Sequence, residues 1–154
     1  MAGAGEPPSA AAIAAGAGVS RLTVYHHFGS QAGLLAALAA EAGRPGVTAT
    51  TGGPVERLRG LIGGACAHWA TDPALFRRLR AATEMVDPEA IRALAGALAE
   101  TDRLRPGCSV REAEDVIAIA TSFAAFDHLH RDGRRSPAAV AEILLRMCSG
   151  LLAS

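Results

Sequence analysis

AAGAGVSRLTVYHHFGSQAGLL, residues 14–35, has the residue spacing of two short helices joined by a tight turn. Gly18 stands where the first helix must end, and the left-handed backbone that ends helices is cheap only for glycine. Ser20 offers a side-chain oxygen that can accept a free backbone N–H and so begin the second helix. Val19, between them, is expected to fill the angle between the helices. We therefore predict helices over residues 10–16 and 21–27.

The second of these helices carries hydrogen-bonding side chains at Arg21, Thr23, Tyr25 and His26, whereas Val24 is expected to point inward. The order of features is a small residue, a turn glycine, an apolar plug, a capping residue and then a polar-faced helix. This order is typical of a helix-turn-helix motif whose second helix enters the major groove of DNA. Phosphate and base-edge contacts are the functional interpretation of the polar face, and a merely solvated helix is the alternative.

YHHFGS at residues 25–30 and GLL at residues 33–35 extend the motif, and with them the segment resembles the DNA-binding domain of tetracycline-repressor (TetR) type regulators. The sequence departs from that family in two respects. It has little of the long amphipathic helix that relatives carry before this point, and Gln31 stands where they often have a phosphate-binding lysine. The resemblance implies a DNA-binding surface formed by Ser9, Ser20, Arg21, Thr23, Tyr25, His26 and Gln31.

The composition of the 154 residues predicts an all-α protein, because alanine is abundant and β-branched alternation is rare. The formal net charge is zero with histidine neutral, and the chain contains arginine but no lysine. Zero net charge argues against a protein that coats nucleic acid non-specifically, because such binding depends on neutralising phosphates. The odd number of cysteines indicates reduced thiols. No charged signal-peptide segment and no membrane-spanning run is evident, so we predict a cytoplasmic location with no membrane partner.

The breaker-rich segment GRPGVTATTGG, residues 43–53, predicts a domain boundary. Residues 1–43 would form the helix-turn-helix domain, truncated at its N-terminus relative to the family. Residues 54–154 would form a helical domain for ligand binding and dimerisation. Within it, Pro54, Pro73 and Pro88 are expected to occupy the first positions of successive helices, where proline loses no needed hydrogen bond.

The last two predicted helices carry the dimerisation hypothesis. One long helix is expected over Ser109–Arg131. Its centre, Val116–Phe126, contains no charged residue on any face. The other is expected over Ser136–Leu152 with apolar residues on two faces. Helices of this kind must be covered on every side, and a two-fold homodimer with a four-helix bundle would do so. A charge at Ala120 or Leu144 is therefore expected to disrupt the dimer.

The large soft side chains of the C-terminal half could line a pocket for an unknown small-molecule inducer, although ordinary core packing is the alternative for each one. They are Trp69, Phe76, Met85, Phe123 and Phe126. No metal site is predicted, because the pairs Cys66/His68 and His128/His130 are two residues apart and point to different helix faces. No cofactor is predicted either.

The sequence thus predicts a homodimeric, DNA-binding transcriptional regulator, a repressor released from its double-stranded operator by a small molecule. A dimeric small-molecule-binding or interaction protein that has lost DNA binding is the alternative. An enzyme is not expected, because no convergent set of titratable residues is evident.

Overall fold

The computed structural model of the chain is all-α and describes residues 9–43, 45, 51–79 and 86–154. Its described residues form two compact units, one of residues 9–43 with 74–79 and the other of residues 45, 51–73 and 86–154. The helices are α1 (Ala10–Ala17), α2 (Arg21–Phe28), α3 (Gln31–Ala42), α4 (Pro54–Trp69), α5 (Pro73–Arg78), α6 (Pro88–Glu100), α7 (Val110–Ala120), α8 (Phe123–Asp127), the π-helix η1 (His128–Asp132), α9 (Pro137–Cys148) and the 3-10 helix η2 (Ser149–Leu151). The predicted fold class is confirmed.

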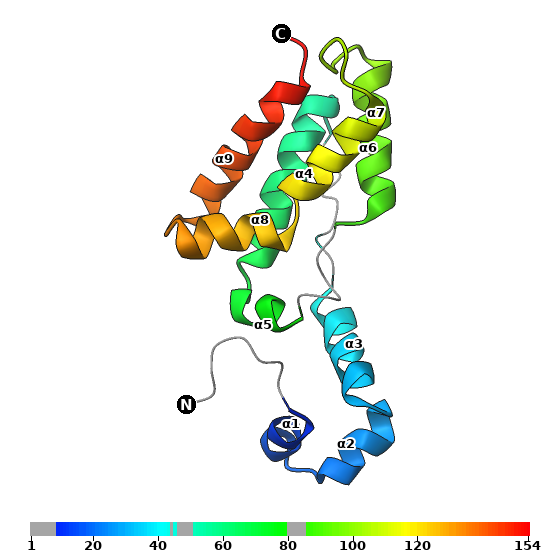
Figure 1. The fold of residues 1–154 in the computed structure, drawn as a ribbon, viewed down its shortest axis with the longest axis vertical. Helices are drawn as coiled ribbons and strands as arrows, with labels where there is room; N and C mark the ends of the chain where they lie inside the picture. Colours follow the sequence, from blue (N-terminus) through cyan, green and yellow to red (C-terminus); the bar gives the residue numbers. More distant parts are fainter. Residues whose placement is uncertain (1–8, 44, 46–50, 80–85) are drawn as a thin grey trace. The chain divides into compact units, whose positions relative to one another are not determined.

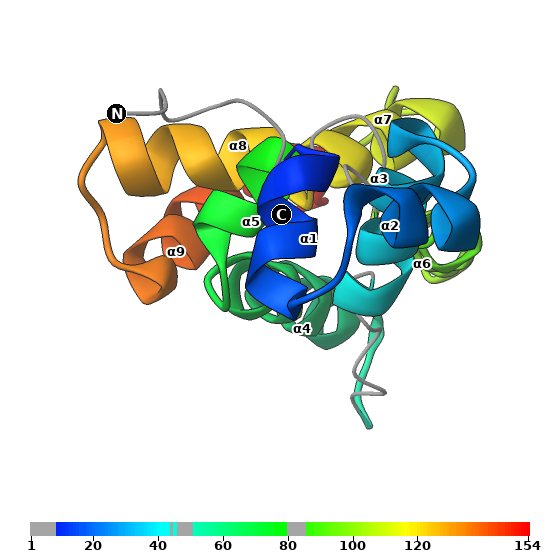
Figure 2. The same cartoon turned by 90° about the horizontal axis from the view of Figure 1, so that it is seen from below.

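In the first unit, α1 packs on α2 and α2 packs on α3 (Figure 2). Each of these helices begins at a serine whose side-chain oxygen accepts a backbone N–H three residues later, which confirms the predicted cap at Ser20. The core between them is small, because half of its fully buried members are alanines. Its buried residues are Ala10, Ala14, Val24 and Leu34, with Ile13, Phe28 and Leu38 packed against them.

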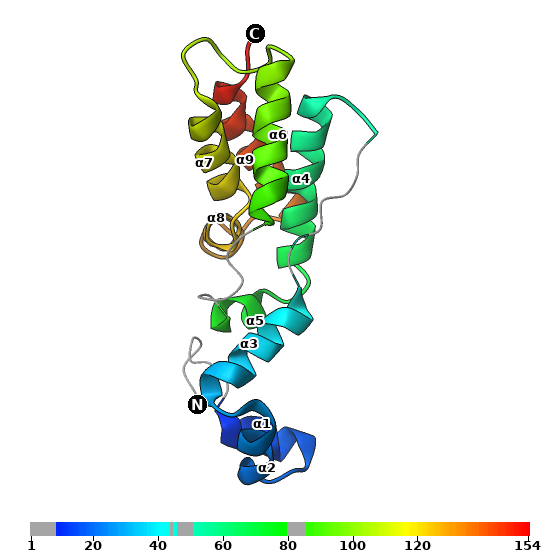
Figure 3. The same ribbon diagram turned by 90° about the vertical axis from the view of Figure 1, so that its right-hand side faces the viewer.

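The second unit is built on a ring of helices. α4 packs on α6 and α9, and α7 packs on the same two helices, so the ring closes (Figures 1 and 3). α8 and η1 cross one end of this ring, since Figure 1 shows them from the side and Figure 3 along their axis. The interior is lined with large buried apolar side chains. Its largest members include Trp69, Phe126, Leu58, Ile62, Leu98, Ile117 and Leu144.

The predicted single helix over Ser109–Arg131 is wrong, because α7 ends at Ala120 and α8 begins at Phe123. The Thr121 hydroxyl donates to the carbonyl oxygen of Ile117 at 2.8 Å, competing with the helical backbone. The Ser122 side chain then accepts from the N–H of Ala125 at 3.2 Å and caps a new helix. Two consecutive hydroxyl residues therefore break a helix that the apolar pattern alone would continue.

The surface proposed for dimerisation also needs correction. Ala120 and Leu144 are 5% and 2% exposed, so both side chains are buried within one protomer. Within the protomer α7 packs on α6 and α9, and α9 packs on α4, so part of the apolar surface that the sequence assigned to a partner is covered by the chain itself. The large apolar side chains that remain exposed on α7 and α9 are Val110, which is 38% exposed, and Ile119 and Met147, which are each 64% exposed.

The proline-led helix starts are confirmed: Pro54, Pro73 and Pro88 each occupy the first position of their helix. The Asp87 carboxylate caps α6 by accepting from the N–H of Glu89 at 3.1 Å. α7 begins with a full capping box, in which Ser109 and Glu112 each accept the other's backbone N–H. No helix of the described segments is long and apolar enough to cross a membrane.

Candidate nucleic-acid interface

The turn between α1 and α2 is held by backbone hydrogen bonds. Gly18 has a left-handed backbone with φ of 67°, and its neighbour Val19 donates its N–H to the carbonyl oxygen of Ala14 at 3.0 Å. These bonds satisfy carbonyl groups that the end of α1 would leave free. The expectation that Val19 is a core residue is wrong, since its side chain is 43% exposed. Its contribution to the turn comes from the backbone, while the small side chains of α1 fill the core.

The start of α2 is fixed by two hydroxyl groups. Ser20 has an extended backbone, and its side-chain oxygen accepts the N–H of Thr23 at 3.1 Å. The same oxygen lies 2.8 Å from the Thr23 hydroxyl, so the two side chains hold each other in place. A hydroxyl has one donor and two acceptor positions, and each group therefore keeps capacity for an external partner. The first turn of α2 presents a rigid pair of hydroxyls to solvent.

The outward face of α2 combines polar and apolar groups. Arg21, Thr23, Tyr25 and His26 are all exposed, and Val24 is 5% exposed, so the predicted division between faces is confirmed. Leu22 lies on the outward face as well and is 79% exposed, a position that the sequence analysis did not single out. The exposure of Leu22 could have been predicted from helical periodicity, because a residue two positions before the buried Val24 points away from the core that Val24 enters.

The start of α3 is equally well defined. Gly29 has φ of 72°, and Ser30 caps α3 by accepting the N–H of Gly33 at 3.0 Å. A Cβ atom at Gly33 would come within 2.1 Å of the carbonyl oxygen of Phe28, so only glycine allows α3 to approach the end of α2 this closely. This close approach sets where Gln31, in the first turn of α3, is presented.

All of the side chains predicted to contact DNA are exposed in the first unit, and several of them lie at the starts of its helices. Ser9 caps α1, Ser20 caps α2 and Gln31 opens α3, so each lies where backbone N–H groups point toward solvent. Such helix starts favour phosphate oxygens as partners. The individual contacts of these side chains with DNA stay predictions.

The charge of this surface is low. Arg21 is the only arginine in residues 9–43, where Glu41 is the only acidic residue. His26 and His27 stand in the last turn of α2. Each DNA phosphate that a protein neutralises contributes to affinity, so this surface has few charged groups that can bind the phosphate backbone of DNA. Recognition would depend on Arg21, hydroxyls, helix starts and groove contacts.

The aromatic residues proposed for an inducer pocket lie in two units. Trp69 and Phe123 pack edge to face with ring centroids 5.6 Å apart, and Phe126 lies 6.4 Å from Phe123. All three are buried in the second unit. Phe76 is buried in α5, which belongs mainly to the first unit, and Met85 lies outside the described residues. Three of the five side chains are thus brought together.

The described part of the chain contains no group of three or more His, Cys, Asp or Glu side chains placed to hold a metal ion. Cys66 and Cys148 are buried, and burial raises the pKa of each thiol to about 11 because it disfavours the thiolate. Glu112 has its pKa lowered below the ordinary value of a carboxyl group by hydrogen bonds from Ser109.

Residues 8–38 match the family described as bacterial regulatory proteins, tetR family, which confirms the resemblance of the helix-turn-helix segment. A solved structure described as the molecular basis for control of antibiotic production by a bacterial hormone is similar in fold. Its TM-score is 0.66 at 18% sequence identity, over 94% of this chain and 87% of that chain. No curated protein matches the chain.

Proposed function

We propose that the chain is a DNA-binding transcriptional regulator of the tetR family of bacterial regulatory proteins, whose family model matches residues 8–38. We propose further that it acts as a repressor that a small molecule releases from its operator. The observation that carries this proposal is the outward face of α2. The Gly18 turn and the Ser20 cap fix the start of α2. Its outward face presents hydrogen-bonding side chains that are not part of the buried core. A second helix of this kind suits the major groove.

Within this proposal, α2 is the recognition helix and its residues divide by chemistry. Arg21 offers a bidentate donor for guanine or a charge for a phosphate. Tyr25 and His26 supply further hydrogen bonds. Leu22 offers an apolar surface suited to the methyl group of thymine, since apolar side chains read that group. Ser9, Ser20 and Gln31, at the helix starts, would position the domain on phosphates.

We infer that the regulator works as a homodimer through α7 and α9. Ile119 on α7 and Met147 on α9 are each 64% exposed, which is unusual for large apolar side chains on helices that pack on each other. A two-fold contact over this surface would cover both. It would also pair two copies of α2, which a palindromic operator requires at a spacing of roughly 34 Å or a multiple of it.

The inducer is proposed to act on the second unit near Trp69, Phe123 and Phe126. A ligand that binds more tightly to a conformation with the wrong spacing of the two recognition helices would shift the population away from DNA. The relevant property of the ligand is its differential affinity for the two conformations. A mostly apolar small molecule fits the aromatic surroundings.

A selection experiment tests DNA binding directly. The purified chain is incubated with a pool of random double-stranded DNA, bound duplexes are amplified, and affinity for the enriched sequence is measured against salt concentration. We expect a palindromic sequence, and we expect Arg21→Ala to weaken binding and lower the salt slope by about one unit per recognition helix if Arg21 contacts phosphate. Arg92→Ala on α6 is the matched control and should change neither quantity.

The second candidate is a dimeric small-molecule-binding protein without operator affinity. The low charge of the helix-turn-helix segment favours it, because Arg21 is the only arginine in residues 9–43. In the selection experiment this candidate predicts no enrichment of any sequence at low salt, together with an intact dimer. Enrichment that depends on Arg21 would instead support the repressor.

A further inference from the structure

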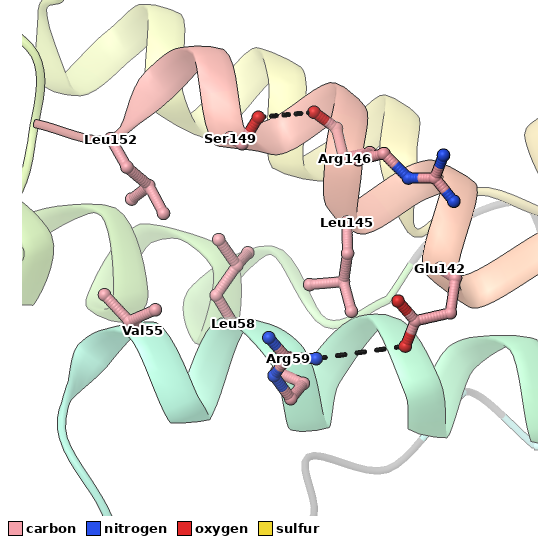
Figure 4. Close-up of a pocket in the computed structure, with 8 residues that line it drawn as sticks. All are labelled: Val55, Leu58, Arg59, Glu142, Leu145, Arg146, Ser149 and Leu152. Carbon is pink, nitrogen blue, oxygen red and sulfur yellow. Dashed lines mark hydrogen bonds and ion pairs between the residues drawn. The ribbon is translucent and has the colours of Figure 1, made fainter. Parts of the chain in front are cut away.

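A hollow of about 210 Å³ lies between α4 and α9, away from the aromatic residues of the proposed inducer site. Its apolar lining comes from Val55 and Leu58 on α4 and from Leu145 and Leu152 at the C-terminal end of the chain. Figure 4 shows the α4 side chains pointing toward those of α9 and the segment after it. Leu58 is 1% exposed and forms the floor, whereas the other three are half-buried. The hollow is therefore a shallow apolar groove open to solvent.

A small residue creates the hollow. Ser149 lies between Leu145 and Leu152 on the same side of the chain and also lines the groove. Its hydroxyl donates to its own helix, to the carbonyl oxygen of Arg146 at 2.6 Å, and so turns toward the backbone (Figure 4). A larger aliphatic side chain at this position would fill the space that the leucines leave.

The rim of the groove carries an excess of positive charge. Arg59 and Glu142 form an ion pair across it at 3.9 Å, and their side chains are 65% and 64% exposed. A pair so long and so exposed holds its partners weakly. Arg146 also lines the groove, and among the described residues it has no ion pair. The residues that line the groove thus include two guanidinium groups and one carboxylate.

We propose that this groove binds a small amphipathic monocarboxylate, with its aliphatic tail on Leu58 and its neighbours and its carboxylate on Arg146. The apolar floor suits an aliphatic tail, and the Arg146 guanidinium, which has no ion pair among the described residues, suits a single negative group. The volume is below the roughly 300–1,000 Å³ of drug-sized sites, so the ligand is short. This site is separate from the proposed inducer site and does not depend on DNA binding.

Octanoate is the probe, and isothermal titration calorimetry below its micelle concentration is the measurement, with 1-octanol as the neutral analogue. We expect saturable binding of one octanoate per chain and binding of 1-octanol about tenfold weaker, because the alcohol lacks the charge-assisted hydrogen bond. Arg146→Gln should weaken octanoate binding by a similar factor and leave 1-octanol unchanged. Glu142→Gln should strengthen octanoate binding, because it removes the only competing carboxylate that lines the described groove.

Ser149→Leu should abolish binding of both probes by filling the groove, with thermal unfolding as the check that the variant folds. Arg92→Gln on α6 is the matched control for charge and should bind octanoate like the unmodified chain. Equal affinity for octanoate and 1-octanol, or octanoate binding unaffected by Arg146→Gln, would overturn the proposal. So would the absence of saturable binding. None of these readouts involves an operator, so they are independent of the proposed repressor function.

Discussion

The indole N–H of Trp69 donates a hydrogen bond to the backbone carbonyl oxygen of Thr121 at 3.0 Å, and both residues are buried. This bond joins the last residue of α4 to the residue that follows the end of α7. A carbonyl group at the end of a buried helix needs a partner. Trp69 supplies it, and the chain is free to begin α8 in a new direction at Ser122.

Trp69→Phe is expected to destabilise the second unit by about 1–3 kcal/mol, because it leaves the buried carbonyl oxygen of Thr121 without its donor. Urea unfolding followed by circular dichroism measures the loss, since the chain has one tryptophan and fluorescence would be lost with it. Ser122→Ala is a useful comparison and should cost about 1 kcal/mol through loss of the α8 cap. Equal stability of Trp69→Phe and the unmodified chain would contradict the role of this bond.

Local signals in the sequence were sufficient to predict most helix starts, because serine, aspartate and proline act within one helical turn. The break between α7 and α8 was not predictable in the same way. Residues 116–126 are uncharged, and their periodicity does not distinguish one long helix from two short ones. At the break, the Thr121 and Ser122 hydroxyls bond locally, and the Thr121 carbonyl oxygen also accepts a tertiary bond from Trp69, 52 residues away in the chain. Long-range partners of this kind are invisible to a local pattern.

The candidate DNA-binding surface was predictable to the level of the helix face but not of each side chain. The buried position of Val24 follows from helical periodicity, and so does the exposure of Arg21 and Thr23. Val19 was misassigned because its place depends on how much room the core leaves. The buried residues of that core are Ala10, Ala14, Val24 and Leu34, and the Val19 side chain at the turn remains outside it.

The Ile119→Glu and Met147→Glu variants should each shift the chain from dimer to monomer in sedimentation velocity, because a charge on a covered apolar face is costly to bury. Both side chains are exposed in the protomer, so thermal stability of the monomer should change little. Arg111→Glu, at an exposed position of α7, is the control for added negative charge. A monomeric unmodified chain at micromolar concentration would contradict dimerisation through this surface.

Leu22→Ala should relax operator specificity at one base pair without changing the salt slope, because an apolar contact to a thymine methyl group releases no counterions. The affinity loss at that base pair should be about 1 kcal/mol or more, within the range for a mismatched base pair. Comparing binding to the selected operator and to a variant with uracil in place of thymine measures the effect. If uracil weakens binding of Leu22→Ala as much as binding of the unmodified chain, Leu22 does not read that methyl group.

The thiols should differ in reactivity. Cys66 and Cys148, whose pKa is raised to about 11 by burial, stay protonated at pH 8 and should resist alkylation, whereas the half-exposed Cys108 should react first. The unfolded chain ionises these thiols more readily than the folded chain, so stability should fall as pH rises from 9 toward 11. Mass spectrometry after iodoacetamide treatment identifies the modified residue. Early modification of Cys148 would contradict its burial.

The two units should also differ in local stability. α1 and α2 are short helices, and such helices depend on the apolar area they bury. Half of the fully buried members of their core are alanines, whereas the second unit buries Trp69, Phe126 and several leucines. We expect backbone amides of residues 9–43 to exchange with deuterium much faster than those of α4 and α9, because local opening needs less free energy there. Exchange followed by mass spectrometry measures the difference.

Binding to the selected operator should slow exchange in residues 9–43, since a ligand that binds only the folded domain stabilises it by mass action.

A variant that enlarges the small core offers an independent check. Ala14→Val, at a fully buried position, adds volume next to Val24 and Leu34 within the same core cluster. It should slow exchange in this unit if the core is underfilled and accelerate it if the core is already close-packed. Equal protection of both units in the unmodified chain would show that the alanine-rich core is not the weak point of the fold.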